Sequence, residues 1–145
     1  MVTKKEVDNF VKSQRTFTAQ GPEYKKTQRA LRDVLFALPD KVYENVTKNL
    51  ILSVLHEKPL GQLMHLKAVN GKFKIMQLTV PKDIPIEVLR WVIAHELGHA
   101  AQGRNWRKSD GNKLEINADK RAEEWGFPFT KFIENWISTR KRKYE

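Results

Sequence analysis

The sequence predicts one α+β domain with helices at both ends of the chain and a small sheet between them. The chain has 145 residues, which is close to the commonest size of a single domain. Apolar residues recur at helical spacing before residue 47 and again after Pro85. The stretch between them is apolar, partly β-branched and interrupted by Asn70-Gly71, which is typical of strands. We therefore treat residues 1–145 as a single domain.

Three helices are expected before the sheet. Thr3 and Glu6 have the spacing of a capping box, which predicts that the first helix begins there. Gly21-Pro22 ends this helix, a second helix follows over about residues 23–38, and Pro39-Asp40 starts a short third helix. Residues 1–20 are a candidate regulatory or flexible N-terminal helix.

The sheet is expected to be small and antiparallel. Asn-Gly favours a two-residue type I′ turn, because both positions need positive φ. A turn at Asn70-Gly71 sets a register in which Ala68 faces Phe73 and Leu66 faces Ile75. One face of this hairpin is apolar, and we expect it to line the core. That face carries Met64, Leu66, Ala68, Phe73 and Ile75.

Three more helices follow Pro85. The first, over about residues 86–102, is apolar almost all round, which is typical of a central, buried helix. The second covers about residues 113–125 and ends at Gly126-Phe127-Pro128. The last is amphipathic, and residues 140–145 are expected to form a basic tail.

Composition excludes several classes of protein. Cysteine is absent, which excludes disulfide scaffolds, Cys-ligated zinc and thiol nucleophiles. No apolar run reaches the roughly 20 residues of a membrane helix, and the N-terminus lacks the apolar region of a secretory signal. We therefore expect a soluble, cytoplasmic protein without a membrane partner. The net charge of +10 favours anionic partners and predicts weak nucleic-acid binding, with a solvated charged surface as the alternative.

The segment His95-Glu96-Leu97-Gly98-His99 lies in the helix that is expected to be buried. Histidines at i and i+4 share one helix face, so both imidazoles can reach one ion. The glutamate beside the first histidine can take a proton from metal-bound water. Burying these groups unpaired would cost on the order of several kcal/mol. We therefore expect a zinc site with Glu96 as the catalytic base, and two satisfied surface histidines are the alternative.

A catalytic zinc site needs three protein ligands and an open position. Because cysteine is absent and no histidine follows His99, the third ligand is expected to be a downstream carboxylate. Glu115 is the best candidate and lies 16 residues after His99. Asp119, one helical turn further on, can accept the free N–H of a zinc-bound histidine. Ala118 and Ala122 are small, so the two helices can approach closely.

Alternatives to these assignments stay open. Glu115 also has the spacing of a helix-capping pair with Asn112. His56 and His65 lie on strand-like segments, either as surface histidines or as groups that stabilise an oxyanion. Rival carboxylate ligands are Asp110, Asp119, Glu123 and Glu124. Candidate phosphate contacts are Arg140-Lys141-Arg142-Lys143 and the basic residues Arg104, Arg107 and Lys108 around Trp106.

The motif and its downstream carboxylates resemble a known group of enzymes. His95-Glu96-Leu97-Gly98-His99, followed by Glu115-Ile116-Asn117-Ala118-Asp119, is similar to the gluzincin clan of HEXXH zinc metallopeptidases. The short chain and the sequence Ala94-His95-Glu96-Leu97-Gly98-His99 look most like the ImmA/IrrE-type and the minimal one-domain gluzincins. The resemblance covers roughly residues 35–127.

The resemblance implies a zincin-like fold and a zinc-dependent endopeptidase. It implies that His95, His99 and Glu115 hold Zn²⁺, that water fills the fourth position, and that Glu96 deprotonates this water as it attacks a peptide carbonyl. The expected substrate is a protein or peptide, with a DNA-bound protein among the candidates, lying along an edge strand from the hairpin Leu60–Val80. The alternative is a DNA-associated binding module or an inactive relative with a structural zinc, which would not need Glu96.

Overall fold

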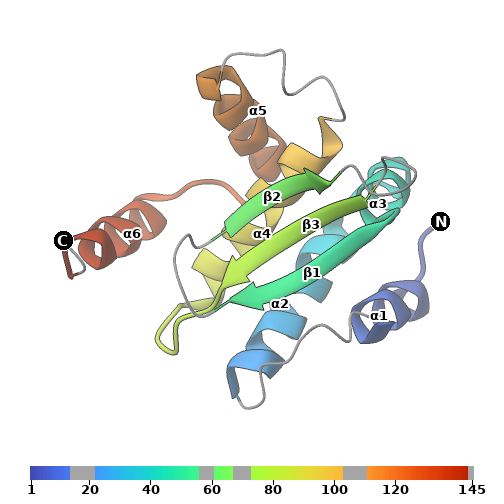
Figure 1. Cartoon of the computed structure of the whole chain (residues 1–145), viewed down its shortest axis with the longest axis horizontal. Helices are drawn as coiled ribbons and strands as arrows, with labels where there is room; N and C mark the ends of the chain where they lie inside the picture. The colour runs from blue at the N-terminus through green and yellow to red at the C-terminus, as the bar shows by residue number, and fades with distance from the viewer. Residues whose placement is uncertain (14–21, 56–60, 67–72, 103–110, 144–145) are drawn as a thin grey trace.

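The structure is a computed structural model that describes residues 1–13, 22–55, 61–66, 73–102 and 111–143. In these residues the chain forms helices at both ends and a small sheet between them, as the sequence predicts (Figure 1). In chain order the elements are α1 (Lys4–Ser13), α2 (Pro22–Ala37), α3 (Asp40–Thr47), β1 (Leu50–Leu55), β2 (Gly61–Leu66), β3 (Phe73–Thr79), α4 (Ile86–Ala101), α5 (Gly111–Glu124) and α6 (Lys131–Lys143).

The sheet has the strand order β1-β3-β2 and is mixed. β1 runs parallel to β3, and β2 runs antiparallel to β3. The expectation of an antiparallel sheet is therefore wrong for β1. The physical reason is that β1 pairs with β3 rather than with the strand that follows it in sequence, and this leaves β2 at an edge of the sheet.

The register of the β2–β3 pair differs from the predicted one by two residues. Leu66 pairs with Phe73 and Met64 with Ile75, whereas the expected turn at Asn70-Gly71 predicts Ala68 opposite Phe73. A slip of two residues keeps every side chain on its original face, so the hydrophobic pattern cannot distinguish the two registers. The predicted turn at Asn70-Gly71 lies outside the described residues.

The buried face of β3 is also the opposite of the predicted one. Met76 and Leu78 are buried, whereas Ile75 is half-buried. β3 carries apolar residues on both faces, so alternation alone does not choose between them. The buried face is the one that α2 and α4 cover, and both helices lie behind the sheet in Figure 1. Together, β1, β3, α2 and α4 contribute these core residues: Leu50, Leu52, Met76, Leu78, Leu31, Leu35, Leu89 and Ile93.

The first helix begins with the predicted capping box. The backbone N–H of Glu6 donates to Thr3 Oγ1 at 3.2 Å, and the backbone N–H of Thr3 donates to a Glu6 carboxylate oxygen at 2.6 Å. The bond from Thr3 lowers the pKa of Glu6. Val7 and Val11 of α1 are buried in the core. The described part of the N-terminal segment is thus an integral piece of the fold, and a regulatory role for residues 1–20 stays a prediction.

The chain turns sharply at Gly126, which follows α5. Gly126 has a φ of +95°, and the backbone N–H of Phe127 bonds back to the carbonyl of Ala122 at 2.8 Å. This is the left-handed helix ending that glycine favours. The next helix, α6, extends through Lys143, so residues 140–143 continue a helix rather than forming a tail. Within it, Arg140 contacts Asp83 at 3.2 Å.

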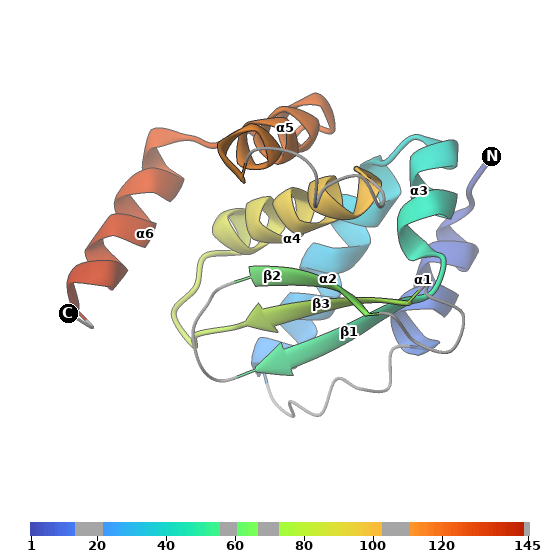
Figure 2. The same ribbon diagram turned by 45° about the horizontal axis from the view of Figure 1, so that its top comes forward.

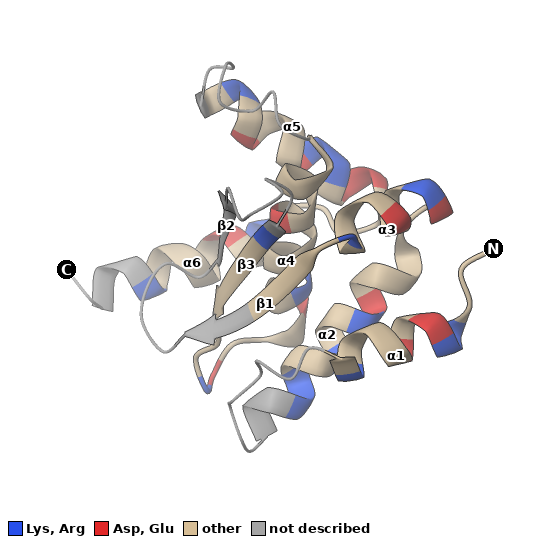
Figure 3. Cartoon of the chain, turned by 45° about the vertical axis from the view of Figure 1, so that its right-hand side comes forward, with Lys and Arg blue, Asp and Glu red and all other residues tan. Residues whose placement is uncertain are grey.

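Charged residues of both signs are interspersed over the surface. Figure 3 shows basic and acidic positions side by side on α1, α3 and α5. Ion pairs such as Arg32–Asp8, with 2.9 Å between nitrogen and oxygen, connect neighbouring helices. Among the described helices, none is both long enough and apolar enough to span a membrane.

We expect Gly126→Ala to lower the free energy of unfolding by about 1–2 kcal/mol, because the left-handed backbone conformation places a Cβ close to the following carbonyl. Urea denaturation should show a lower midpoint with an unchanged slope. Gly126→Asn is the matched control and should cost less, because asparagine tolerates this conformation better. Equal stability of Gly126→Ala and the parent protein would contradict the assignment.

Candidate metal centre

The centre is built on α4, the buried helix that lies between the sheet and α5. Figure 2 shows α5 on the far side of α4 from the strands. Val88, Leu89 and Ile93 anchor α4 in the core. Despite this setting, the side chains of two charge-bearing residues are also buried, since His95 is 8% exposed and Glu96 is 6% exposed. Polar groups buried this deeply need partners.

The partners of His95 come from α5. Ala118 and Ala122 of α5 are fully buried, which confirms the predicted close approach of the two helices. Glu115 and Asp119 lie one turn apart on the same side of α5 as these alanines. The approach therefore carries both carboxylates to the face of α4 that bears His95 and His99.

Three potential ligand atoms converge at this crossing. The Nε2 atom of His95 lies 2.9 Å from Glu115 Oε2 and 3.1 Å from His99 Nε2, and His99 Nε2 lies 3.2 Å from Glu115 Oε1. A tetrahedral zinc ion with ligand distances of about 2.0–2.1 Å requires ligand atoms about 3.3 Å apart. The two contacts to Glu115 involve different oxygens of its carboxylate. One ligand atom from each of the three residues lies within 4.8 Å of the others, so together they form a group able to hold a metal ion.

The fourth side chain, Asp119, orients the first histidine. Its Oδ1 atom lies 2.8 Å from Nδ1 of His95. A carboxylate accepts hydrogen bonds, so Nδ1 carries the proton that it donates. In the neutral ring, Nε2 then presents a lone pair to Glu115 and His99. The contacts of Nε2 with Glu115 and His99 need a proton or a metal ion between the paired atoms, and one metal ion bound by all three residues would serve both contacts.

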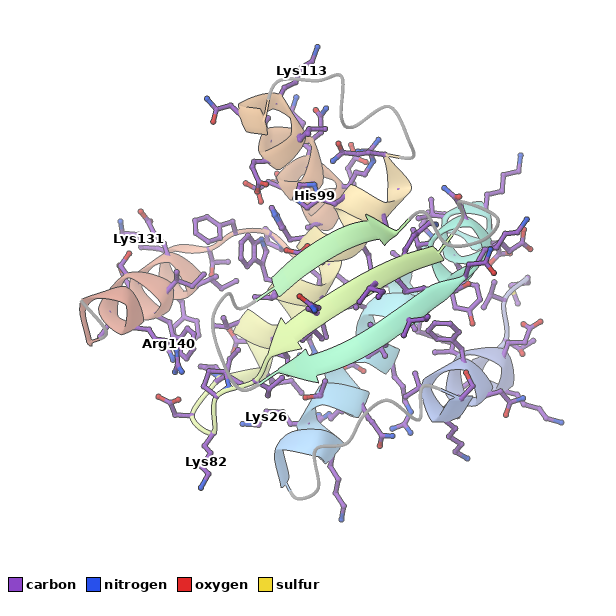
Figure 4. All side chains as sticks on the ribbon, in the orientation of Figure 1. Lys26, Lys82, His99, Lys113, Lys131 and Arg140 are labelled. Carbon is purple, nitrogen blue, oxygen red and sulfur yellow. The ribbon has the colours of Figure 1, made fainter. Side chains whose placement is uncertain are left out.

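Burial favours the neutral form of the second histidine. Burial lowers the pKa of His99, and the charge of the neighbouring His95 lowers it further, while Glu115 opposes both effects. A lower pKa keeps the imidazole unprotonated near neutral pH, which is the form that binds metal ions. Figure 4 shows His99 between α5 and the edge strand β2.

Sequence reasoning missed one neighbour of the site, Trp91. Its ring lies 5.1 Å from the ring of His95, between centroids, and 4.7 Å from the ring of Phe129. Trp91 precedes His95 by four residues, so helical spacing alone could have found this contact. The indole packs against the imidazole and limits how the ring of His95 can turn.

Glu96 lies on the other side of the histidines from α5. With about 100° of rotation per residue, Gly98 is about 60° from His95 on one side and Glu96 about 100° on the other. Ala118 of α5 contacts the Gly98 side. Helix geometry therefore places Glu96 on the side of the histidines away from Gly98, and its role as the catalytic base stays a prediction.

The remaining predicted site residues divide into two sets. α5 begins at Gly111, so Asn112 lies inside the helix, and Glu115 acts in the cluster rather than as the partner of an N-cap. Glu123 and Glu124 are exposed and are not part of the metal-capable group found in the described residues. β2 pairs His65 with Lys74 of β3, but the side chain of His65 is outside what the structure describes. Also outside it are His56, Asp110, Trp106 and the basic residues Arg104, Arg107 and Lys108.

Comparison of the chain with protein-family models, with curated proteins and with solved structures found no match.

We expect Glu115→Ala to weaken zinc binding more than Asp119→Ala does, because the first change removes a ligand and the second removes only the partner that orients His95. Loss of such an orienting partner typically costs about 10–100-fold in affinity. Competition with a chromogenic chelator measures both dissociation constants. Glu123→Ala, an exposed carboxylate on the same helix, is the control and should bind zinc like the parent protein. The opposite order, with Asp119→Ala stripped of metal and Glu115→Ala loaded, would reverse the assignment.

Proposed function

We propose that this protein is a zinc-dependent endopeptidase with a zincin-like fold, related in mechanism to the gluzincins. The observation that carries the proposal is the convergence of His95, His99 and Glu115 on one point, with buried Glu96 beside them. Three protein ligands leave one position of a tetrahedral site open, which distinguishes catalytic zinc sites from structural ones.

Zinc held by these side chains would supply a Lewis acid that acidifies water and polarises the carbonyl oxygen of a peptide bond. Glu96 would accept a proton from the attacking water as its oxygen bonds to the carbonyl carbon. Glu96 would then pass this proton to the amide nitrogen as the C–N bond breaks, so that the amine leaves neutral. Asp119 would hold the proton on Nδ1 of His95 throughout and keep Nε2 available as a ligand atom.

The edge position of β2 supports a peptide as the substrate. β2 pairs with β3 on one side, and the strand order leaves its other side without a strand partner in the described sheet. A peptide can add to such an edge through main-chain hydrogen bonds, which read the backbone and not its sequence. Because α4 packs against β2 and carries both histidines, a peptide on this edge would pass close to the metal centre.

A structural zinc in a binding module is the second candidate, and the site chemistry separates it from an enzyme. A structural site is closed by four protein ligands, whereas the metal-capable group in the described residues supplies three. A structural site also has no use for a buried carboxylate that is not a ligand. The effect of changing Glu96 therefore decides between the two.

We expect Glu96→Gln to keep its fold and its zinc while cleaving peptides at least about 100-fold more slowly, because the amide cannot act as the base. A broad peptide library with a mass-spectrometric readout measures the cleavage rate. Glu87→Gln, an exposed glutamate on the same helix, is the matched control and should cleave at the parent rate. Equal cleavage by Glu96→Gln and the parent protein, or a zinc-loaded parent protein that cleaves no peptide, would contradict the proposal.

A further inference from the structure

Gly98 lies where α4 packs against the backbone of α5. A Cβ added at Gly98 would lie 2.9 Å from the carbonyl oxygen of Ala118 and 3.0 Å from its Cα atom. Both are backbone atoms, so no rotation of a side chain can relieve the contact. Protein interiors are close-packed and do not absorb such an overlap without movement. A side chain at this position would push one helix away from the other.

The crossing point lies at the level of the metal centre. Ala118 follows Glu115 by three residues and directly precedes Asp119. A displacement of α5 at Ala118 would therefore carry both carboxylates with it. The contacts at stake are short, at 2.9 Å from His95 to Glu115 and 2.8 Å from His95 to Asp119, so a shift of a few tenths of an ångström already alters them.

Large buried apolar side chains are found after α5, at Trp125, and not on the helix itself among its described residues. Among the side chains that the structure describes on α5, the buried ones are Ala118 and Ala122, and these bury little apolar surface. Ile116 is 55% exposed. Near the start of α5, the side chain of Gln102, which caps the end of α4, donates from Nε2 to the carbonyl of Leu114 at 3.1 Å. The close backbone approach and the carboxylate contacts are thus part of what docks α5 on α4.

We propose that Gly98 is a positioning residue of the metal centre: the missing Cβ lets α5 approach α4 closely enough for Glu115 to complete the ligand set and for Asp119 to orient His95. Metal binding and the docking of α5 are then coupled, since each favours the same helix spacing. The proposal rests on the metal centre of the proposed function and is independent of whether the centre cleaves peptides.

The test is Gly98→Ala in the full chain. Alanine is a better helix former than glycine, so a helix without crowding would tolerate or favour the change. We expect zinc affinity to fall by at least about 10-fold, as for loss of an orienting partner, with an altered visible absorption spectrum of the Co²⁺-substituted protein, because the carboxylate ligand is displaced. Gly126→Ala is the matched control: an added Cβ there meets nothing within 4 Å, so zinc affinity and the Co²⁺ spectrum should stay like those of the parent protein even though stability falls.

Hydrogen exchange on the parent protein gives a second readout that needs no variant. Added Zn²⁺ should slow exchange of the α5 amides more than that of the α2 amides. Parent-like zinc affinity and Co²⁺ spectrum in Gly98→Ala, or equal protection of α2 and α5, would overturn the proposal. If the parent protein binds zinc but cleaves nothing, the proposed peptidase activity is wrong. The zinc affinity of Gly98→Ala still tests the positioning role in that case. A parent protein that binds no zinc would overturn both.

Discussion

The close backbone contact between α4 and α5 is the constraint on which the rest of the candidate site depends. α4 supplies two imidazoles from one face, and α5 supplies the carboxylates that meet them. Neither helix forms the centre alone. Small residues at the crossing, Gly98 on one helix and Ala118 and Ala122 on the other, set a spacing at which side chains as short as aspartate and glutamate reach the histidines.

The burial of polar side chains in α4 lowers the stability of the fold. Aliphatic residues anchor α4 in the core, and further aliphatic residues at its other buried positions would stabilise the fold more. Instead it buries His95 and Glu96, at a cost that partners must offset. Asp119 and Glu115 offset part of it for His95, and a bound cation would offset more, because it satisfies several lone pairs at once. Positions that cost stability in an otherwise consistent fold are expected at functional sites.

The residues of the metal-capable group could be predicted from the sequence because their placement depends on local spacing. The i, i+4 spacing places both histidines on one face of α4, and the same spacing places Glu115 and Asp119 on one face of α5. The sheet depends on partner choice, which is not local. β1 pairs with β3 rather than β2, the hairpin slips by two residues, and Met76 rather than Ile75 faces the core. β3 is apolar on both faces, so the sequence alone left these choices open. The sequence shows Gly98 only as part of the histidine motif, and its close contact with Ala118 is visible only with α5 in place.

The central claim is that His95, His99 and Glu115 share one zinc ion and leave a position open for chemistry. A crystal of the zinc-loaded protein, with data collected on both sides of the zinc absorption edge, tests it most directly. The account predicts one anomalous peak per chain at about 2.0–2.1 Å from each of the three ligand atoms, with a non-protein oxygen as the fourth ligand. A peak elsewhere in the molecule, or a fourth ligand from the protein itself, would contradict it.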